Sequence, residues 1–257
     1  MPKLPEDKKF LDLSDYARPF AIILVKLLYP TKVGAYTLTF SFLIVGIFVS
    51  ILIYKNTLLY FAALLLLVKS MLDAADGEMA RQRNTPSLVG RYFDSVSDFV
   101  VNLFLFLSIA LTFKINIVIT VLSLIAFQLQ GSLYNYYYLI KRYQCDGDKT
   151  SRIFEREEPK PFPRDNPRLL KLLHKTYLII YGWQDALVHK LDKKAIETKE
   201  LPGWFLTLVS IFGLGFQLLL IAAFIFHGSH NNVIYFFLVP YSLLAIIVIM
   251  IRRIFVK

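Results

Sequence analysis

Two short stretches of this chain decide its fold: Asp73-Ala74-Ala75-Asp76-Gly77-Glu78-Met79-Ala80-Arg81 and Gly90-Arg91-Tyr92-Phe93-Asp94-Ser95-Val96-Ser97-Asp98. Each stretch lies at the edge of a long apolar run, and together they carry four aspartates. A carboxylate at membrane depth is unfavourable by roughly 2.5–3.5 kcal/mol on insertion scales. The four aspartates therefore need a compensating cation, and a bound metal is the simplest explanation.

The apolar runs around these stretches indicate an integral membrane protein. The chain has 257 residues, of which 56% are hydrophobic, and its mean hydropathy is +0.53. A membrane-spanning helix needs about 20 mostly apolar residues. We predict an all-α fold with six transmembrane helices, over about 33–54, 57–78, 90–113, 115–140, 203–226 and 232–251.

Two further segments complete the predicted fold, which we treat as a single membrane domain over 1–257. Residues 12–30 are apolar but short and interrupted by charges, so we expect an interfacial amphipathic helix before the first span. Residues 141–200 form an insert between spans four and five. Within it, apolar residues recur at helical spacing from Pro167 to Leu191. This pattern fits a helix lying on the membrane surface, and equally a packed helix of a small cytoplasmic insert.

The charge distribution predicts the orientation. All Lys and Arg residues except Lys55, Lys69 and Lys114 lie on, or at the edge of, the side that holds both termini and the insert. The positive-inside rule makes that side cytoplasmic. The formal net charge of +10 then reflects topology and attraction to anionic lipid rather than nucleic-acid binding. The single cysteine, Cys145, excludes an internal disulfide.

Helical geometry brings the aspartates together. At about 100° per residue, Asp73 and Asp76 share one face of the second span, and Asp94 and Asp98 form a stripe on the third. Two carboxylates from each helix can converge on one point. Mg²⁺ and Mn²⁺ prefer oxygen ligands, and four carboxylates suit two such ions. Such a pair could clamp the attacking and leaving oxygens of a phosphoryl displacement.

Small residues and one arginine accompany the carboxylates. Gly77, Ala80 and Gly90 leave room for a nucleotide to approach the backbone, although close helix packing is the usual reason for small residues in membranes. Arg81 can bind a phosphate with two hydrogen bonds, or it can extend to the interface as a snorkelling side chain.

The eight positions Asp73, Asp76, Gly77, Ala80, Arg81, Gly90, Asp94 and Asp98 read D-x2-D-G-x2-A-R-x8-G-x3-D-x3-D. This pattern resembles the signature of the CDP-alcohol phosphotransferase family of membrane enzymes. The resemblance implies six membrane helices, often in a homodimer. It also implies the transfer of a substituted phosphoryl group from a CDP-alcohol to an acceptor hydroxyl, with release of CMP, in phospholipid biosynthesis.

The resemblance also implies roles for single residues. Asp73, Asp76 and Asp94 would be metal ligands, and Asp98 would be both a ligand and the general base on the acceptor hydroxyl. Gly77, Ala80 and Arg81 would contact the CDP part of the donor, with Gly90 beside them. We favour CDP-diacylglycerol as the donor and expect a bacterial inner-membrane enzyme whose site faces the cytoplasm. The acceptor stays open among inositol phosphate, glycerol phosphate, serine and a lipid alcohol.

Other residues are weaker candidates. Lys69, one turn before Asp73, could bind the phosphate of an acceptor or offset the carboxylates. A polar group on span four could contact the acceptor, although hydrogen bonding between helices is the commoner role; it comprises Gln128, Gln130, Ser132 and Asn135. His174 and His189 are expected to be solvated surface residues. A rival function, a cation transporter, would use the same four carboxylates as an ion site.

Overall fold

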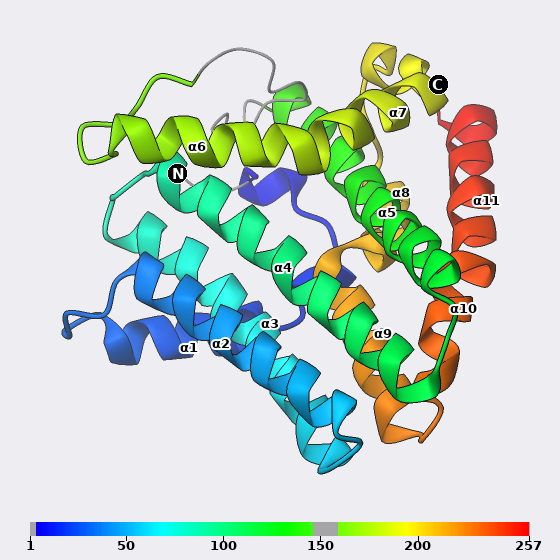
Figure 1. Cartoon of the computed structure of the whole chain (residues 1–257). Helices are drawn as coiled ribbons and strands as arrows, with labels where there is room; N and C mark the ends of the chain where they lie inside the picture. The colour runs from blue at the N-terminus through cyan, green and yellow to red at the C-terminus, as the bar shows by residue number, and fades with distance from the viewer. Residues whose placement is uncertain (1–3, 146–158, 257) are drawn as a thin grey trace.

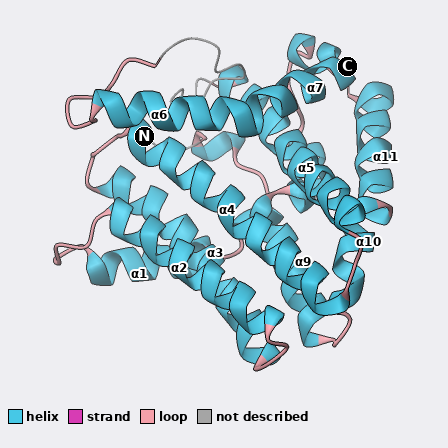
Figure 2. Cartoon of the chain, in the orientation of Figure 1, coloured by secondary structure: helices cyan, strands magenta, loops and turns pink. Residues whose placement is uncertain are grey.

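The computed structural model describes residues 4–145 and 159–256, and this part of the chain folds into helices without a strand (Figures 1 and 2). The all-helical prediction is therefore confirmed for the described residues. The helices are α1 Arg18–Leu28, α2 Ala35–Tyr54, α3 Leu59–Gln82, α4 Leu88–Phe113, α5 Ile117–Gln144, α6 Pro167–Tyr177, α7 Trp183–Leu191, α8 Gly203–Val209, α9 Leu214–Phe226, α10 Val233–Leu238 and α11 Pro240–Phe255.

The long helices form a bundle, and α6 and α7 lie across one end of it, at the top of Figure 1. Helix α2 packs against both α3 and α4, while α3 also packs against α9, and α5 against α10. Aromatic rings fill the contact between α4, α5 and α10, where the Phe127 ring lies 5.1 Å from Phe106 and 4.9 Å from Phe237. Helices α6 and α7 contact α4 and α5, respectively.

The lengths and composition of the described helices account for four or five of the six predicted spans. By length and composition, four described segments could cross a membrane: α2, α4, α5 and the stretch His230–Phe255. A fifth results if the bent pair Gly203–Phe212 and Leu214–Phe226 counts as one span. Helix α3 is not among them, because Lys69, Asp73 and Asp76 interrupt its apolar run. The prediction of six spans, with α3 as the second, stays a prediction.

The predicted fifth span is not one straight helix. Its two halves meet at Gly213 with a bend of 49°. The N-terminal segment explains the break, because the side chain of Ser14 occupies the space beside Gly213: a Cβ atom there would lie 2.3 Å from Ser14 Oγ. The backbone N–H of Leu13 also donates to Ser210 Oγ at 2.9 Å. The N-terminal segment thus packs into the bundle, and the helix starts again beyond it.

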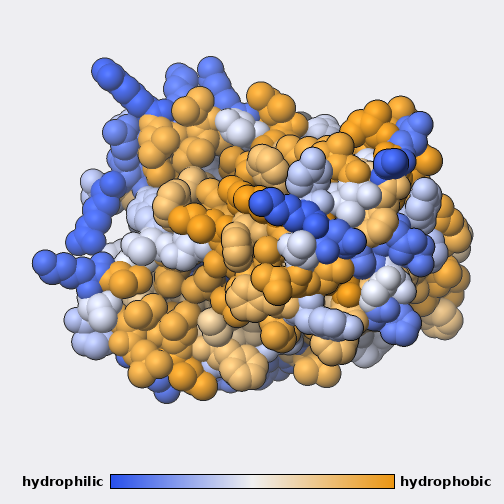
Figure 3. All heavy atoms as spheres, turned by 60° about the horizontal axis from the view of Figure 1, so that its bottom comes forward, coloured by the Kyte–Doolittle hydropathy of each residue, from blue (hydrophilic) through white to orange (hydrophobic). Residues whose placement is uncertain are grey.

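Apolar side chains cover much of the outer surface. They dominate the face shown in Figure 3, and many large ones are exposed along single helices. Examples are Phe40, Ile44 and Phe48 on α2, and Ile246, Ile247 and Met250 on α11. Exposed apolar surface of this extent marks contact with lipid or with another protein. Together with the long apolar helices, it supports the assignment to the membrane.

The predicted helix from Pro167 to Leu191 is present, with one π-helical turn over Leu178–Gly182 between α6 and α7. One side of it packs closely against the bundle. Leu170, His174 and Tyr177 are buried there, and the Tyr177 ring lies 5.1 Å from that of Tyr92 on α4.

Asp165 fastens the chain before α6 to the start of α4. Its carboxylate accepts hydrogen bonds from Ser87 Oγ at 2.5 Å and from the backbone N–H of Leu88 at 3.0 Å. Ser87 is the N-cap of α4, and its Oγ accepts from the N–H of Gly90 at 2.9 Å. Two otherwise unpaired N–H groups of the first turn are satisfied in this way.

Asp192 fastens the chain after α7 to the C-terminal helix. Its carboxylate, only 1% exposed, accepts from Arg252 Nε and Tyr137 Oη, each at 2.6 Å, and also from Arg252 Nη2. We call Asp192, Arg252 and Tyr137 the Asp192 cluster. It joins α5, α11 and the segment after α7 through a fully buried ion pair.

Candidate active site

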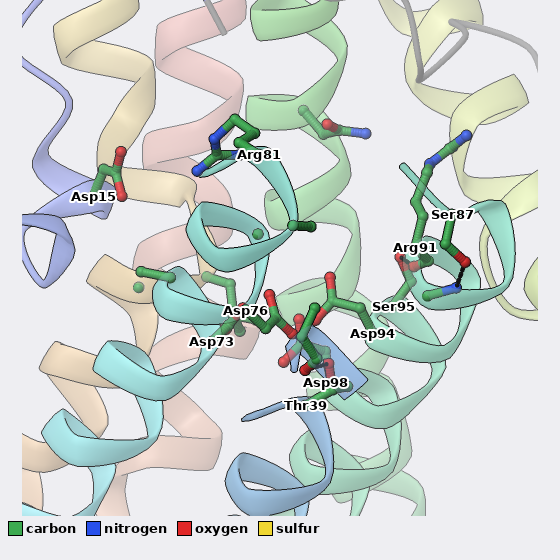
Figure 4. Close-up of a pocket in the computed structure, with 18 of the residues that line it drawn as sticks. Asp15, Thr39, Asp73, Asp76, Arg81, Ser87, Arg91, Asp94, Ser95 and Asp98 are labelled. Carbon is green, nitrogen blue, oxygen red and sulfur yellow. Dashed lines mark hydrogen bonds between the residues drawn. The ribbon is translucent and has the colours of Figure 1, made fainter. Parts of the chain in front are cut away.

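The structure brings the four predicted aspartates together. We call Asp73, Asp76, Asp94 and Asp98 the motif aspartates; α3 carries the first two and α4 the others. Their side chains point toward one another in Figure 4. One carboxylate oxygen each from Asp73, Asp76 and Asp94 lies within 4.8 Å of the other two. Three oxygens at this separation can bind one divalent cation.

The donor set fits a hard cation. Asp94 Oδ1 is buried and has no hydrogen-bond partner among the described residues. An unpaired anionic oxygen in such a position is strongly unfavourable unless a cation or a donor meets it. Carboxylate oxygens are the preferred ligands of Mg²⁺ and Mn²⁺. The residues present therefore suit the predicted divalent metal.

Asp98 differs from the other three motif aspartates. It is not part of the group within 4.8 Å, and its Oδ1 instead accepts a short hydrogen bond from Lys69 Nζ. Lys69 Nζ also donates to Asp73 Oδ2 at 2.8 Å and lies 4.4 Å from the centre of the Phe42 ring. The Lys69 side chain is fully buried. Of the two roles considered for Lys69, its contacts match the one in which it offsets carboxylate charge.

Thr39 on α2 is a site residue that sequence reasoning missed. Its Oγ1 donates to Asp76 Oδ2 at 2.5 Å, and the pair is buried. Threonine is common in apolar helices, and Thr39 lies 37 positions before Asp76, so no local pattern connects them. As a result α2, which packs against both α3 and α4, orients one carboxylate of the group of three.

The motif glycines do not serve close helix packing. A Cβ atom on Gly77 would meet the Arg81 side chain at 3.4 Å, and one on Gly90 would meet Ser87 at 3.5 Å, which are ordinary contacts. Gly46, by contrast, lies where a Cβ would be 2.5 Å from Val101, so this glycine lets α2 approach α4. Gly77 and Gly90 both line a cavity, which agrees with their predicted role of leaving room for a ligand.

Arg81 lines the same cavity and is held in place by an acidic neighbour. Its Nη2 donates to Glu78 Oε2 at 2.9 Å, and Arg18 Nη2 approaches the same oxygen at 3.6 Å. Arg18 belongs to α1, the helix predicted to lie at the interface. The two guanidinium groups therefore share one carboxylate, and Arg18 Nη1 also donates to Asp15 Oδ2 at 3.0 Å, so two carboxylates face the two arginines.

A cavity of about 1150 Å³ contains all eight motif positions. Residues outside the motif also line it, and the helical segment from Pro167 to Leu191 supplies Tyr177, Tyr181 and Asp185. These follow one another at intervals of four, so they form one stripe along the helix across the bundle end. That spacing is visible in the sequence, but nothing local shows that the stripe faces the motif.

Tyr181 closes the cavity as a neutral group. Its Oη donates to the backbone carbonyl of Ser95 at 2.9 Å. Burial raises the pKa of Tyr181 well above its usual value, and the negative charge of Asp98 raises it further. The phenol therefore stays protonated at neutral pH and presents no charge to the cavity.

The weaker candidates separate into two groups. Gln128, Ser132 and Asn135 line the cavity, whereas Gln130 donates to the carbonyl of Phe237 at 2.9 Å and joins helices. The expectation of solvated histidines is wrong for His174, whereas His189 is partly exposed. His174 is buried against the Tyr92 ring, and His189 Nδ1 lies 3.2 Å from Tyr136 Oη. Both side chains belong to the helical segment that packs against the bundle.

Comparison with known proteins gives a family match for part of the chain. No curated protein matches the chain. Residues 33–150 match the sequence model described as CDP-alcohol phosphatidyltransferase, and this range includes α2, α3, α4, α5 and every motif residue. The resemblance drawn from the eight motif positions is thereby confirmed. Residues 33–150 of this chain therefore match the CDP-alcohol phosphatidyltransferase domain.

Proposed function

We propose that this protein transfers a substituted phosphoryl group from a CDP-alcohol to an acceptor hydroxyl and releases CMP, in phospholipid biosynthesis. CDP-diacylglycerol is the donor that we favour. The observation that carries the proposal is the convergence of Asp73, Asp76 and Asp94 within 4.8 Å, inside a cavity lined by the whole family motif. The cavity lies among long apolar helices, where a lipid donor could keep its chains in the bilayer.

Metal binding is assigned to the motif aspartates. Asp73, Asp76 and Asp94 would hold divalent cations, Mg²⁺ or Mn²⁺ and two in number, with Asp98 as a further ligand. Such ions would neutralise the donor diphosphate and stabilise CMP as it leaves. Thr39 orients Asp76 through its hydrogen bond, so a ligand oxygen is already fixed before the donor binds.

Asp98 is proposed as the general base. It accepts the proton of the acceptor hydroxyl, whose oxygen then bonds to the distal phosphorus of the donor. The bond between that phosphorus and the oxygen retained by CMP breaks in line with the attack. Lys69, hydrogen-bonded to both Asp73 and Asp98, positions the base relative to the metal ligands.

The donor nucleotide is assigned to the glycine-lined part of the cavity. Gly77 and Gly90 leave open space there, and Ala80 adds only a methyl group. Arg81 would supply positive charge for the diphosphate. We also propose a homodimer, which the exposed apolar helix faces could support.

Metal-dependent binding of CMP tests the proposal most directly. The purified protein in detergent should bind CMP only with Mg²⁺ or Mn²⁺, and should release CMP from CDP-dioleoylglycerol when an acceptor is present. The rival function, a cation transporter, needs neither property. Binding of Mg²⁺ without any affinity for CMP would favour the transporter and contradict the proposal.

The cytoplasmic orientation has its own test. In a Cys145→Ser background, Lys160→Cys and Asn231→Cys each introduce one exposed thiol, on opposite sides of the proposed membrane. A membrane-impermeant maleimide applied to intact cells should label the cysteine at 231 and leave the cysteine at 160 unlabelled until the cells are opened. The reverse pattern would remove the site from cytoplasmic CDP donors.

A further inference from the structure

The outer side of the helical segment from Pro167 to Leu191 has no part in the proposed reaction. Its inner side packs against α4 and α5 and supplies the stripe of residues that lines the cavity. Large apolar side chains are exposed on the outer side, and they are Leu169, Leu172, Ile179, Trp183 and Leu187. Ile179 is 77% exposed, which is more than any other large apolar residue of the described chain. A strip of this kind marks contact with lipid or with another molecule.

The exposed part of α6 has a cationic edge and an apolar edge. At about 100° of turn per residue, Arg168, Lys171 and Lys175 lie together along one edge. Leu169 and Leu172 lie along the other. An apolar edge beside an edge rich in Lys and Arg is typical of helices that lie in a membrane interface, where the cations meet anionic lipid headgroups.

Two hydrogen bonds place this segment at the depth of the membrane boundary. Tyr181 Oη donates to the carbonyl of Ser95 on α4, and Ser132 Oγ on α5 donates to Gln184 Oε1, both at 2.9 Å. Helices α4 and α5 are joined at their far ends by the short loop 114–116. An apolar span of about 20 residues, measured from that loop, ends at about residue 94 on α4 and about residue 136 on α5. Ser95 and Ser132 therefore lie close to the boundary between hydrocarbon and headgroups.

Trp183 fits this placement. It is the first residue of α7 and is 45% exposed, whereas its neighbour Gln184 is 1% exposed and faces the bundle. Tryptophan is enriched at membrane–water interfaces, because its ring is apolar and its indole N–H seeks a polar partner. Beyond α7, the exposed residues Lys190, Lys193 and Lys194 continue the positive charge.

We propose that the outer side of residues 167–194 is a binding surface for anionic phospholipid. Its apolar edge enters the headgroup layer, and its lysines and arginine attract the negatively charged headgroups. The surface lies outside the family motif, and the inference does not depend on the proposed reaction. Lipid on one side and α4 and α5 on the other hold the helix in place. The cavity wall that this helix supplies is then fixed by the membrane as well as by the bundle.

Trp183 itself can report on the surface. The chain has two tryptophans, so Trp204→Phe leaves Trp183 as the only one. The full-length variant is reconstituted in phosphatidylcholine vesicles that contain either brominated phosphatidylcholine or brominated phosphatidylglycerol at the same mole fraction. Bromine on the lipid quenches tryptophan emission on contact, and acrylamide quenches a tryptophan that is exposed to water.

Two reference positions calibrate the quenching, each in a chain that also carries Trp183→Phe and Trp204→Phe. Phe40→Trp lies on the exposed apolar face of α2 and represents contact with lipid. Lys160→Trp lies at an exposed position before α6 and represents contact with water. Unchanged helical content, measured by circular dichroism, shows that each variant folds.

Brominated lipid should quench Trp183 at least about half as strongly as it quenches the Phe40→Trp reference, and acrylamide should quench Trp183 less than the Lys160→Trp reference. Brominated phosphatidylglycerol should quench Trp183 more strongly than brominated phosphatidylcholine. The preference should be about fivefold in lipid association for each cation at the surface, which corresponds to about 1 kcal/mol.

The double variant Arg168→Gln with Lys175→Gln should remove most of this preference. Lys55→Gln with Lys114→Gln is the matched control. These two lysines are also exposed but follow α2 and α4 at the end of the bundle opposite to α6, so their removal should leave the preference at Trp183 unchanged.

Three outcomes would overturn the inference. Quenching of Trp183 by acrylamide but not by brominated lipid would place the surface in water. Protection from both quenchers would mean that protein covers it, either a second copy of the chain or another partner. Equal quenching by the two brominated lipids would reject the anionic headgroup. None of these outcomes affects metal-dependent binding of CMP, so the proposed function is tested separately.

Discussion

Asp192 is a buried acidic residue and the motif aspartates are buried or half-buried ones, but the two groups have different partners. Asp192 receives two hydrogen bonds from Arg252 and one from Tyr137, so one negative charge meets one positive charge and each carboxylate oxygen has a donor. Among the four motif aspartates, Asp73 and Asp98 share the ammonium of Lys69, and Asp94 Oδ1 has no partner among the described residues.

This difference separates a structural charge from a functional one. A buried charge is tolerated when the chain supplies its counter-charge and hydrogen bonds. The Asp192 cluster meets that condition without any ligand, and it joins segments far apart in the sequence. The motif aspartates do not meet it, so their negative charge is available to a cation from outside the chain. Each prediction below changes one side of this contrast.

Metal removal should have the largest effect. With excess EDTA, CMP release should fall to background, because Lys69 supplies only one positive charge for the four motif aspartates. Addition of Mg²⁺ or Mn²⁺ should restore it. Metal at 100 times its Kd should also stabilise the parent by about 2.7 kcal/mol, measured by thermal unfolding in detergent. Asp76→Asn should lose most of this stabilisation. Full turnover in excess EDTA would contradict the assignment of a metal to the motif aspartates.

The substitution Asp98→Asn should have the second largest effect on CMP release. It keeps the size of the side chain and removes the basic carboxylate, so turnover should fall roughly 10²–10⁴-fold. Affinity for CMP at fixed Mg²⁺ should stay near that of the parent, because the group of three carboxylates is untouched. Asp76→Asn should weaken CMP binding as well. If Asp98→Asn loses binding as severely as Asp76→Asn, its role is ligation and the base lies elsewhere.

Breaking the Asp192 cluster should lower stability instead of activity. Arg252→Met leaves Asp192 buried without its counter-charge, which typically costs about 3–5 kcal/mol. Arg253→Met is the matched control, because Arg253 is exposed and its Nε lies 3.8 Å from Asp192. Thermal unfolding should separate the two variants clearly, while turnover per folded molecule stays near the parent value in both. An unchanged unfolding temperature for Arg252→Met would contradict the structural role assigned to the Asp192 cluster.

The smallest effect, a slight loss of stability, is expected from a substitution of the exposed residue Glu200. Hydrogen bonds from Lys141 and Lys8 lower the pKa of Glu200 to about 2, although its side chain is 48% exposed. A lowered pKa means that the pairing stabilises the fold above the unfolded pKa of about 4.3 and is lost as the pH falls toward 2. Glu200→Gln should therefore unfold slightly earlier than the parent at pH 7. The difference in unfolding temperature between Glu200→Gln and the parent should shrink below pH 4. A difference that grows as the pH falls would contradict the stabilising role of the Glu200 carboxylate.

Much of the site was accessible from local sequence patterns. The eight motif positions follow from fixed spacing on two helices, and the structure gathers all of them around one cavity. The helical segments follow from apolar runs of sufficient length, and the helix from Pro167 to Leu191 from its periodicity.

What the sequence could not supply are contacts between distant segments. Thr39 meets Asp76, and Ser14 occupies the space beside Gly213, through packing that no periodicity encodes. The histidines show the same limit. An amphipathic helix with lysines on one side looks solvated, yet His174 belongs to the side that packs against Tyr92. Lys69 was ambiguous for a related reason, because its partner Asp98 lies 29 residues away on another helix.

The carboxylate of Asp165 has a consequence for protein engineering. It caps the helix that carries Asp94 and Asp98, yet it lies beyond the stretch that matches the family, which ends at residue 150. A chimaera that exchanges only 33–150 with a relative would separate that helix from its cap. The exchangeable module should therefore extend through Asp165, and the grafting boundary is better drawn from hydrogen bonds than from sequence similarity.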